Sequence, residues 1–185
     1  MFRYYVIAIL VCMALIIGAN AFIAPPLQAL VITVICVLCV FGIDALVALF
    51  VRYALPKKLF DPRKRRYRSF SWEKRFYVAI GIRKWKDKIP ETGGLLVKFP
   101  KTKVLDFRDS EYIFRFMEET CYAEIMHVWS IPLGFAVLLL APADMMLTVA
   151  LPVAIINAIL QLLPVLVQRF LRPQLMRVYL RGLKR

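Results

Sequence analysis

Long uncharged runs alternate with strongly polar stretches along the chain, and these runs predict helices that cross a membrane. Residues 4–24 carry no charge, residues 27–51 carry only Asp44, and residues 145–167 carry none. Each run reaches the roughly 20 residues that an α-helix needs to cross the hydrocarbon core of a bilayer. The pattern therefore predicts at least three membrane spans.

A fourth uncharged run, residues 128–143, is shorter than the others. It covers about 24 Å at 1.5 Å per residue, which is less than the roughly 30 Å core. A helix that crosses here has to draw in earlier residues, so we expect a span near 124–142. A re-entrant hairpin over 128–167 is the alternative geometry. In the first case Glu124 and the only histidine, His127, lie at the edge of the hydrocarbon, where charged groups are costly and usually functional.

Composition agrees with this pattern. Hydrophobic residues make up 61% of the 185-residue chain, well above the globular average, and the formal net charge is +14. A strongly basic charge and a high apolar content are typical of a helical membrane bundle with a basic cytosolic face. We predict an all-α, polytopic membrane protein with about four transmembrane helices. It forms a single membrane domain, with a basic cytosolic segment at 52–123 and a basic tail at 168–185.

The distribution of lysine and arginine predicts the orientation. Residues 52–109 hold 18 basic and six acidic residues, and residues 169–185 hold six basic residues and no acid. The turns near 25–26 and 142–144 hold no basic residue. Basic residues favour the cytosolic side of a membrane. We therefore expect a multi-pass protein of the cell membrane with both termini and the central segment in the cytosol.

The central segment begins with the polybasic run "PKKLFDPRKRRYRSF" at 56–70. Such a run beside a membrane span is typical of binding to anionic lipid. Aromatic residues interleave with the basic ones, a pattern also found at nucleic-acid interfaces. Next to a membrane, however, aromatic rings usually lie at the headgroup level. We predict a membrane as the partner and no nucleic acid.

Short helices are expected in the rest of this segment. The pattern favours a helix at 71–80 and a loop or short interfacial helix at 82–89. The sequence "ETGG" at 91–94 predicts a turn. A longer helix is expected at 109–127, with Asp109 or Ser110 as its N-cap.

Metal chemistry is poorly supported. Cys36-x-x-Cys39 has metal-ligand spacing, but no second pair exists and both residues lie in an apolar run, so packing is the better interpretation. Glu124-x-x-His127 has the spacing of di-iron bundles, which need a second such motif and a second histidine. A serine triad is also unsupported, because the chain has no Gly-x-Ser-x-Gly motif. We expect no metal and no bound cofactor.

Four short motifs occur in order: "FSWEK" at 70–74, "RKWKDKIPE" at 83–91, "ETCYAEIMH" at 119–127 and "QRFLRPQL" at 168–175. Together they resemble the glycosyl-4,4'-diaponeurosporenoate acyltransferase family. Those membrane enzymes attach a fatty acyl chain to a sugar hydroxyl of a glycosylated carotenoid. The resemblance implies an O-acyltransferase acting on a lipid-linked sugar.

The chain departs from the family pattern at a few positions. Phe170, Leu171 and Gln174 stand where the family usually has Tyr, Asn and Arg, and Val128 separates the histidine from Trp129. These differences bear more on the carotenoid substrate than on acyl-transfer chemistry.

The chemistry of acyl transfer suits the residues around the histidine. Glu124 and His127 are three apart and share a face of the expected helix, and Thr120 precedes Glu124 by four residues. Transfer to an alcohol needs a base, and imidazole has a suitable pKa near neutral pH. A neighbouring carboxylate can orient the ring and stabilise its cation. We predict His127 and Glu124 as catalytic residues; an interfacial histidine beside a solvated glutamate is the alternative.

Basic and polar residues of the four motifs predict the substrate-binding set. Acyl-coenzyme A carries phosphates and acyl carrier protein is acidic, so basic side chains suit either as donor. The expected substrate-binding residues are Glu73, Arg83, Lys84, Trp85, Lys86, Glu119, Thr120, Gln168, Arg169 and Arg172. Membrane anchoring is the alternative for Trp85, and contact with lipid headgroups is the alternative for Arg169 and Arg172.

Two other functions remain open at this point. One is a non-catalytic membrane protein that binds anionic lipid or scaffolds a complex. The other is a lipid-modifying transferase with a phosphate-bearing polyprenyl substrate, which a basic face would also suit. A scaffold would tolerate loss of Glu124 and His127, whereas a catalyst would not.

Overall fold

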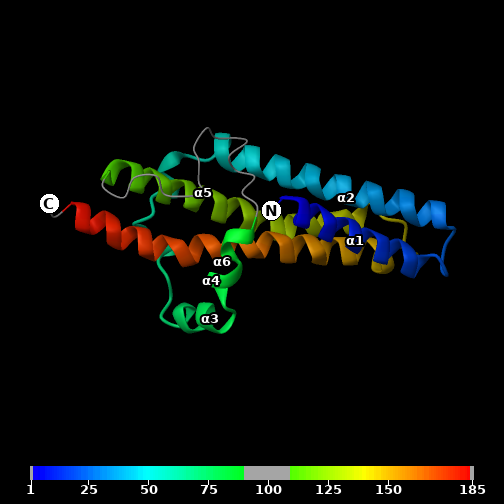
Figure 1. Ribbon diagram of the computed structural model, residues 1–185. Coiled ribbons are helices and arrows are strands. Elements are labelled where there is room, and N and C mark those ends of the chain that lie inside the picture. Colours follow the sequence, from blue (N-terminus) through cyan, green and yellow to red (C-terminus); the bar gives the residue numbers. More distant parts are fainter. Residues whose placement is uncertain (1, 90–108, 184–185) are drawn as a thin grey trace. The chain divides into compact units, whose positions relative to one another are not determined.

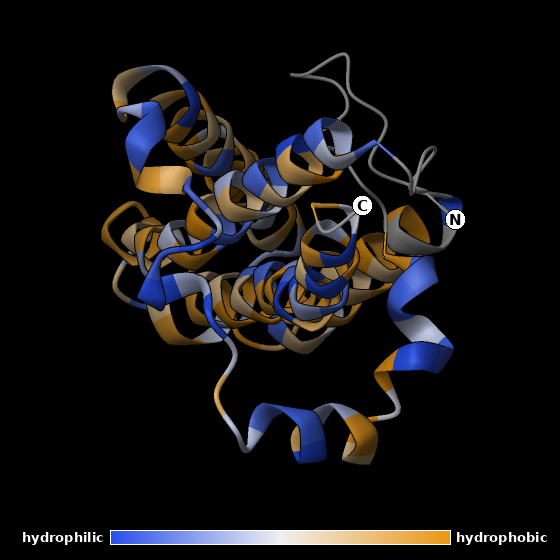
Figure 2. Cartoon of the chain, turned by 90° about the vertical axis from the view of Figure 1, so that its left-hand side faces the viewer, coloured by the Kyte–Doolittle hydropathy of each residue, from blue (hydrophilic) through white to orange (hydrophobic). Residues whose placement is uncertain are grey.

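The computed structural model describes residues 2–89 and 109–183, which form helices, turns and short connections with no strand among them (Figure 1). Coloured by hydropathy, the long helices are mainly hydrophobic, with hydrophilic residues interspersed (Figure 2). A shorter apolar helix covers Val6–Asn20. Three helices are long and apolar enough to cross a membrane: Pro26–Ala54, Ser110–Leu139 and Met146–Gly182. The predicted fold class, an all-α polytopic membrane protein, is confirmed.

The chain forms two compact units. Unit 1 consists of Met1–Phe50 and Met126–Leu162, and unit 2 of Val51–Ile125 and Leu163–Arg185. Helices α5 and α6 each contribute residues to both units. The prediction of one membrane domain with four spans stays a prediction.

Unit 1 is built on α1 (Phe2–Asn20) and α2 (Pro26–Leu49). Pro26 suits the first turn of α2, where the missing N–H of proline has no helical partner to lose. Large apolar side chains on both helices, among them Leu15 and Leu38, point outward, as expected of helices that face hydrocarbon. The buried core of the unit comprises Ile16, Cys36, Val40, Val137, Met145, Val149, Ala150, Val153 and Ala154.

Asn20 ends α1 four residues before the predicted end of the first span at residue 24. Its side-chain Nδ2 donates to the carbonyl of Ile16 at 2.8 Å and to the carbonyl of Thr148 at 2.9 Å. The second bond ties the end of α1 to the π-helical turn Met146–Ala150, which precedes α6. A buried asparagine thus satisfies backbone groups that an apolar residue would leave unpaired.

The short uncharged run at 128–143 belongs to a longer element. Helix α5 covers Ser110–Gly134 and continues as the 3-10 helix Phe135–Leu139. Residues before 128 are therefore part of the same helix, as the length argument requires. The side chain of Asp109 caps α5, since its Oδ1 accepts from the N–H of Glu111 at 2.9 Å and of Tyr112 at 3.0 Å.

Unit 2 contains the polar central segment and the second half of α6 (Leu151–Gly182). Its apolar core joins Ile113, Phe116 and Met117 of α5 to Leu175 of α6. The segment before α5 forms short helices: Phe50–Ala54, Lys57–Phe60, Arg65–Tyr67, α3 (Glu73–Ala79), α4 (Ile82–Trp85) and Lys86–Lys88.

The helix expected at 71–80 is present as α3, and of the two possibilities for 82–89, a loop or a short helix, the structure has a short helix, α4, followed by a 3-10 turn. Gly81 separates them with a φ of 59°, a left-handed conformation that favours glycine. The turn predicted at 91–94 lies outside the described residues.

Candidate active site

Arg172 is the most deeply buried charged side chain of unit 2, at 2% exposure. Its Nε donates to Thr120 Oγ1 at 3.0 Å and its Nη2 to the carbonyl of Thr120 at 3.1 Å. Its Nη1 donates to the carbonyl of Tyr67 at 3.3 Å and lies 2.5 Å from Glu124 Oε2. The guanidinium therefore joins α6 to α5 and to the segment before α3.

Arg169 lies one turn earlier on α6 and binds two carboxylates. Its Nη1 donates to Glu124 Oε1 at 2.8 Å, and its Nε and Nη2 donate to Glu73 Oε1 at 3.2 and 2.5 Å. Glu73 also accepts from the Tyr77 hydroxyl at 2.9 Å. Burial raises the pKa of Tyr77, and so does the bond to Glu73, so the phenol stays protonated and remains a donor.

A further ion pair involves Glu119, which directly precedes Thr120 on α5. Arg52 Nη1 donates to the two carboxylate oxygens of Glu119 at 2.9 and 3.1 Å, and its guanidinium lies 4.6 Å from the ring centroid of Tyr122. We call these seven residues the acid–base cluster: Arg52, Glu73, Glu119, Thr120, Glu124, Arg169 and Arg172. Three arginines face three glutamates, so the buried charges balance, as burial requires.

A cavity of about 460 Å³ adjoins this cluster in unit 2. Its lining includes Glu73 and Arg169 of the cluster together with Arg83 and Lys84 at the start of α4. Among the described residues neither Arg83 nor Lys84 has a carboxylate partner, so both are available to an anion, whereas Arg169 is already neutralised. The structure thus brings four of the predicted substrate-binding residues to one cavity.

Glu119, Thr120 and Arg172 belong to the acid–base cluster, and the remaining three predicted substrate-binding residues have separate positions. Trp85 uses its indole N–H to donate to the carbonyl of Ile80 at 3.0 Å, and Lys86 pairs with its neighbour Asp87. Gln168 is buried on α6. Their predicted contacts with substrate stay predictions.

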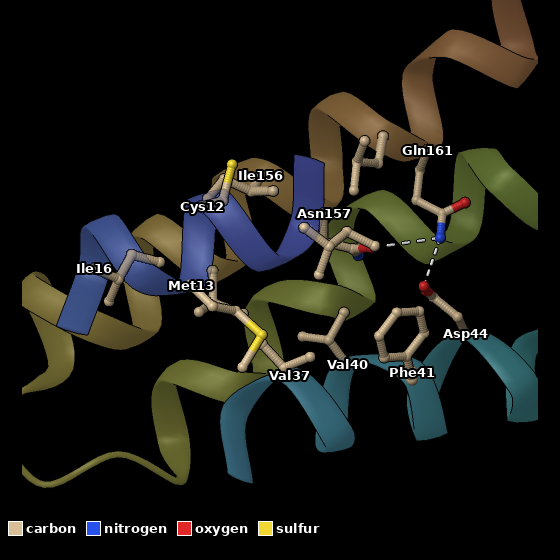
Figure 3. A pocket seen from close by; sticks show the side chains of 13 residues that line it. Cys12, Met13, Ile16, Val37, Val40, Phe41, Asp44, Ile156, Asn157 and Gln161 are labelled. Carbon is tan, nitrogen blue, oxygen red and sulfur yellow. Dashed lines mark hydrogen bonds between the residues drawn. The ribbon is translucent and has the colours of Figure 1, made fainter. Parts of the chain in front are cut away.

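His127 belongs to unit 1 and is part of a second polar group. Its Nδ1 lies 2.5 Å from Gln161 Oε1 of α6. Gln161 Nε2 in turn donates to Asp44 Oδ2 of α2 at 2.5 Å and to Asn157 Oδ1 at 3.4 Å. Figure 3 shows Gln161 between Asp44 and Asn157. We call these four residues, His127, Gln161, Asp44 and Asn157, the polar chain.

The polar chain borders a small apolar cavity of about 70 Å³ in unit 1 (Figure 3). Its walls are apolar side chains such as Met13 and Phe41, and its polar lining consists of Asp44, Asn157 and Gln161. Within the described residues, Asp44 Oδ1 and Asn157 Nδ2 have no hydrogen-bond partner. Unpaired polar atoms in an apolar setting are costly and are common at functional sites.

Glu124 and His127, the two predicted catalytic residues, both lie on α5 and have different recorded partners. Glu124 is bound by Arg169 and Arg172, and His127 by Gln161. The direct assistance of His127 by Glu124 stays a prediction.

Sequence reasoning misses four residues of these two groups. It identifies Asp44 only as the single charge in its run, and it predicts no role for Gln161, Asn157 or Arg52. Their polarity within or next to a candidate span could have identified them, because polar residues inside a membrane are costly and usually functional. For metals, residues 2–89 and 109–183 contain no group of three His, Cys, Asp or Glu side chains placed to hold an ion.

Apolar helices of spanning length, together with buried ion pairs, define a polytopic membrane protein with polar groups buried among its helices. The sequence model of one family, described as glycosyl-4,4'-diaponeurosporenoate acyltransferase, matches residues 56–181. The chain belongs to this acyltransferase family. No curated protein and no solved structure matches it. The matched range includes Glu73, Glu124, His127, Arg169 and Arg172 and begins after Asp44.

Proposed function

We propose that this protein is an integral membrane O-acyltransferase. It moves a fatty acyl chain from a thioester donor, acyl-coenzyme A or acyl carrier protein, to a hydroxyl of a glycolipid or glycosylated isoprenoid. In this reaction the hydroxyl oxygen bonds to the carbonyl carbon, and the carbon–sulfur bond breaks. The hydroxyl proton passes to a base and then to the leaving thiolate, which departs as a thiol.

The observation that carries this proposal is the family match, because it extends over the histidine and most of the acid–base cluster. His127 is the candidate base: it is the only histidine of the chain, and it lies on a helix apolar enough to span a membrane. A lipid-linked acceptor and an acyl chain both suit a base at the edge of the hydrocarbon.

The cavity of unit 2 is the candidate site for the donor. Arg83 and Lys84 offer charges that no described carboxylate neutralises, and phosphate groups or an acidic carrier protein would pair with them. The acid–base cluster contributes Glu73 and Arg169 to the lining of this cavity, and Glu73 holds the guanidinium of Arg169. We assign Arg169 and Arg172 chiefly to organising the site, since their charges are already paired.

We place both termini and the central segment in the cytosol, where acyl donors are made available, on the basis of the lysine and arginine distribution. Cysteines introduced at positions 62 and 184 should be protected from an impermeant thiol reagent applied outside intact cells. Labelling of either position from outside would reverse the proposed orientation.

The test of the function is acyl transfer by purified protein in lipid nanodiscs, with a labelled acyl thioester and a glycolipid acceptor. Loss of a general base typically costs about 10²–10⁴ in rate. His127→Ala should therefore lose most turnover while inserting normally. Val128→Ala is the matched control, because its side chain is exposed on the same helix. If His127→Ala keeps wild-type transfer, catalysis by this residue is excluded and the anionic-lipid scaffold becomes the better function.

A further inference from the structure

The polar chain has members on each of three helices that are apolar enough to cross a membrane. Asp44 lies on α2, His127 on α5 and Gln161 on α6. Polar side chains at such positions are rare and usually mark function. Gln161 occupies the centre, since its amide bonds to both of the other side chains.

The two ends of the Gln161 amide face different hydrogen-bond partners. Its Nε2 faces two acceptors, Asp44 Oδ2 at 2.5 Å and Asn157 Oδ1 at 3.4 Å. The amide oxygen of Asn157 only accepts hydrogen bonds, and so does the carboxylate of Asp44 when it is ionised, so the NH₂ end of the Gln161 amide belongs on this side. Gln161 Oε1 then faces His127 Nδ1.

This orientation selects one tautomer of His127. An amide oxygen has no proton to give, so His127 Nδ1 has to be the donor in the bond to Gln161. In a neutral imidazole the lone pair then lies on Nε2. A base acts through its lone pair, so Nε2 is the nitrogen that would take a proton from a substrate hydroxyl.

We propose that Gln161 and Asp44 are positioning residues, which hold His127 in the tautomer that presents its Nε2 lone pair to the acceptor hydroxyl. This inference rests on the proposed acyl transfer and deepens it. When Nε2 takes the hydroxyl proton, the imidazolium keeps its Nδ1–H bond to Gln161. Asp44, bonded to the other end of the amide, stabilises the positive charge through that bridge. The proton then leaves Nε2 for the departing thiolate.

The arrangement resembles that of a histidine oriented directly by a carboxylate, except that the carboxamide of Gln161 lies between the two groups. A purely structural role for the same bonds would be to hold α2, α5 and α6 together. Interhelical hydrogen bonds of this kind stabilise helix packing in a membrane only modestly. The two roles differ in what they predict for the histidine tautomer and for kcat.

Nitrogen NMR on protein labelled at histidine reads the tautomer directly, and the chain has a single histidine to observe. The wild-type protein should carry its proton on Nδ1. In Gln161→Leu the proton should move to Nε2 in a large part of the population. The same variant should lower kcat about 10–100-fold, the loss typical when a partner that orients a metal-bound histidine is removed. The KM for the donor should stay within about twofold, because Gln161 does not line the donor cavity.

Two variants sharpen the test. Gln161→Glu, protonated beside Asp44, offers a donor to that carboxylate and an oxygen to His127, so it should restore the Nδ1 proton and part of kcat. Asp44→Asn should lower kcat, because its amide no longer fixes the direction of Gln161. Gln28→Leu and Asp144→Asn are the matched controls, since both side chains are exposed in unit 1. Circular dichroism and size-exclusion chromatography in detergent establish that each variant is folded.

A wild-type proton on Nε2 would overturn the proposal. So would a Gln161→Leu variant that keeps its proton on Nδ1, or one whose tautomer changes while kcat does not. The NMR experiment needs no substrate, so its result is independent of the proposed reaction. Absence of acyl transfer by wild-type protein whose tautomer follows Gln161 would contradict the proposed function and, with it, the catalytic part of this inference.

Discussion

The acid–base cluster of unit 2 and the polar chain of unit 1 are both polar groups among apolar helices, yet they are built differently. In the cluster, Arg172 is almost fully buried and each of its donor nitrogens has an acceptor, and three glutamates balance three arginines. Among the described residues, Asp44 Oδ1 and Asn157 Nδ2 of the polar chain have no hydrogen-bond partner, and neither has Glu124 Oε2 of the cluster, although this oxygen lies 2.5 Å from Arg172 Nη1. The cluster is thus held by paired charges, whereas the polar chain is held by the hydrogen bonds of a neutral amide.

This difference corresponds to the two proposed roles: the acid–base cluster organises the site, and the polar chain holds the candidate base. A fully paired set of buried charges fixes geometry, and breaking it costs stability. A histidine that donates to a neutral amide can take up a second proton during a reaction and keep that hydrogen bond. We therefore expect substitutions in the acid–base cluster to act mainly on stability, and substitutions in the polar chain to act mainly on turnover.

The largest expected effect is on stability, from Arg172→Met. This change removes the buried guanidinium and leaves Thr120 and Glu124 short of a donor. Breaking a buried pair on one side typically costs about 3–5 kcal/mol, so unfolding by heat or denaturant in detergent should occur much earlier. Arg177→Met is the matched control, because Arg177 is exposed on the same helix. Equal stabilities of the two variants would contradict the stabilising role that distinguishes the acid–base cluster from the polar chain.

A smaller effect is expected at Gly134, which lies against Asn157 of the polar chain. A Cβ added there would lie 2.5 Å from Asn157 Nδ2, so Gly134→Ala has to displace that amide. Overpacking of this kind typically costs about 1–3 kcal/mol, and turnover should fall further because Asn157 also bonds Gln161. Gly42→Ala has no atom within 4 Å of the new Cβ and should gain stability by about 0.5–1 kcal/mol. Equal behaviour of the two variants would contradict the close packing at Gly134.

The donor cavity gives the next prediction. Arg83→Ala removes a charge that lines the cavity and lacks a described carboxylate partner, so the donor KM should rise about tenfold, as for loss of one charged hydrogen bond. Stability should change little, because Arg83 is exposed. Arg75→Ala, exposed on α3 and absent from the cavity lining, should keep the wild-type KM. An unchanged KM in Arg83→Ala would favour membrane anchoring for this residue.

The smallest effect is expected at the surface pair of Asp61 and Arg63. The hydrogen bond from Arg63 lowers the pKa of Asp61, so the pair stabilises the fold above the ordinary aspartate pKa and loses this contribution as pH falls through the lowered pKa. Asp61→Asn should therefore lower the melting midpoint slightly at pH 6, and the difference from wild type should shrink towards pH 3. A difference that grows in acid would contradict this assignment.

Much of the fold follows from local pattern. Charge-free runs of spanning length predict the apolar helices, and Asp109 ahead of an amphipathic stretch predicts the start of α5, where its side chain caps two backbone N–H groups. The four motifs predict the family, which the match over residues 56–181 confirms. These features are set by neighbours in sequence, so sequence is sufficient to find them.

The sequence by itself determined the helices, the basic excess, the family and the single histidine. Only the tertiary structure decided which polar groups meet. Arg169 joins Glu73 over 96 positions, and Gln161 joins Asp44 over 117. Spacing along one helix could suggest Glu124 as a neighbour of His127, but it could not show that two arginines of α6 already bind that carboxylate. Partners far apart in sequence are determined by how the helices pack and by the need to pair buried polar groups. A local sequence pattern predicts neither the packing nor the pairing.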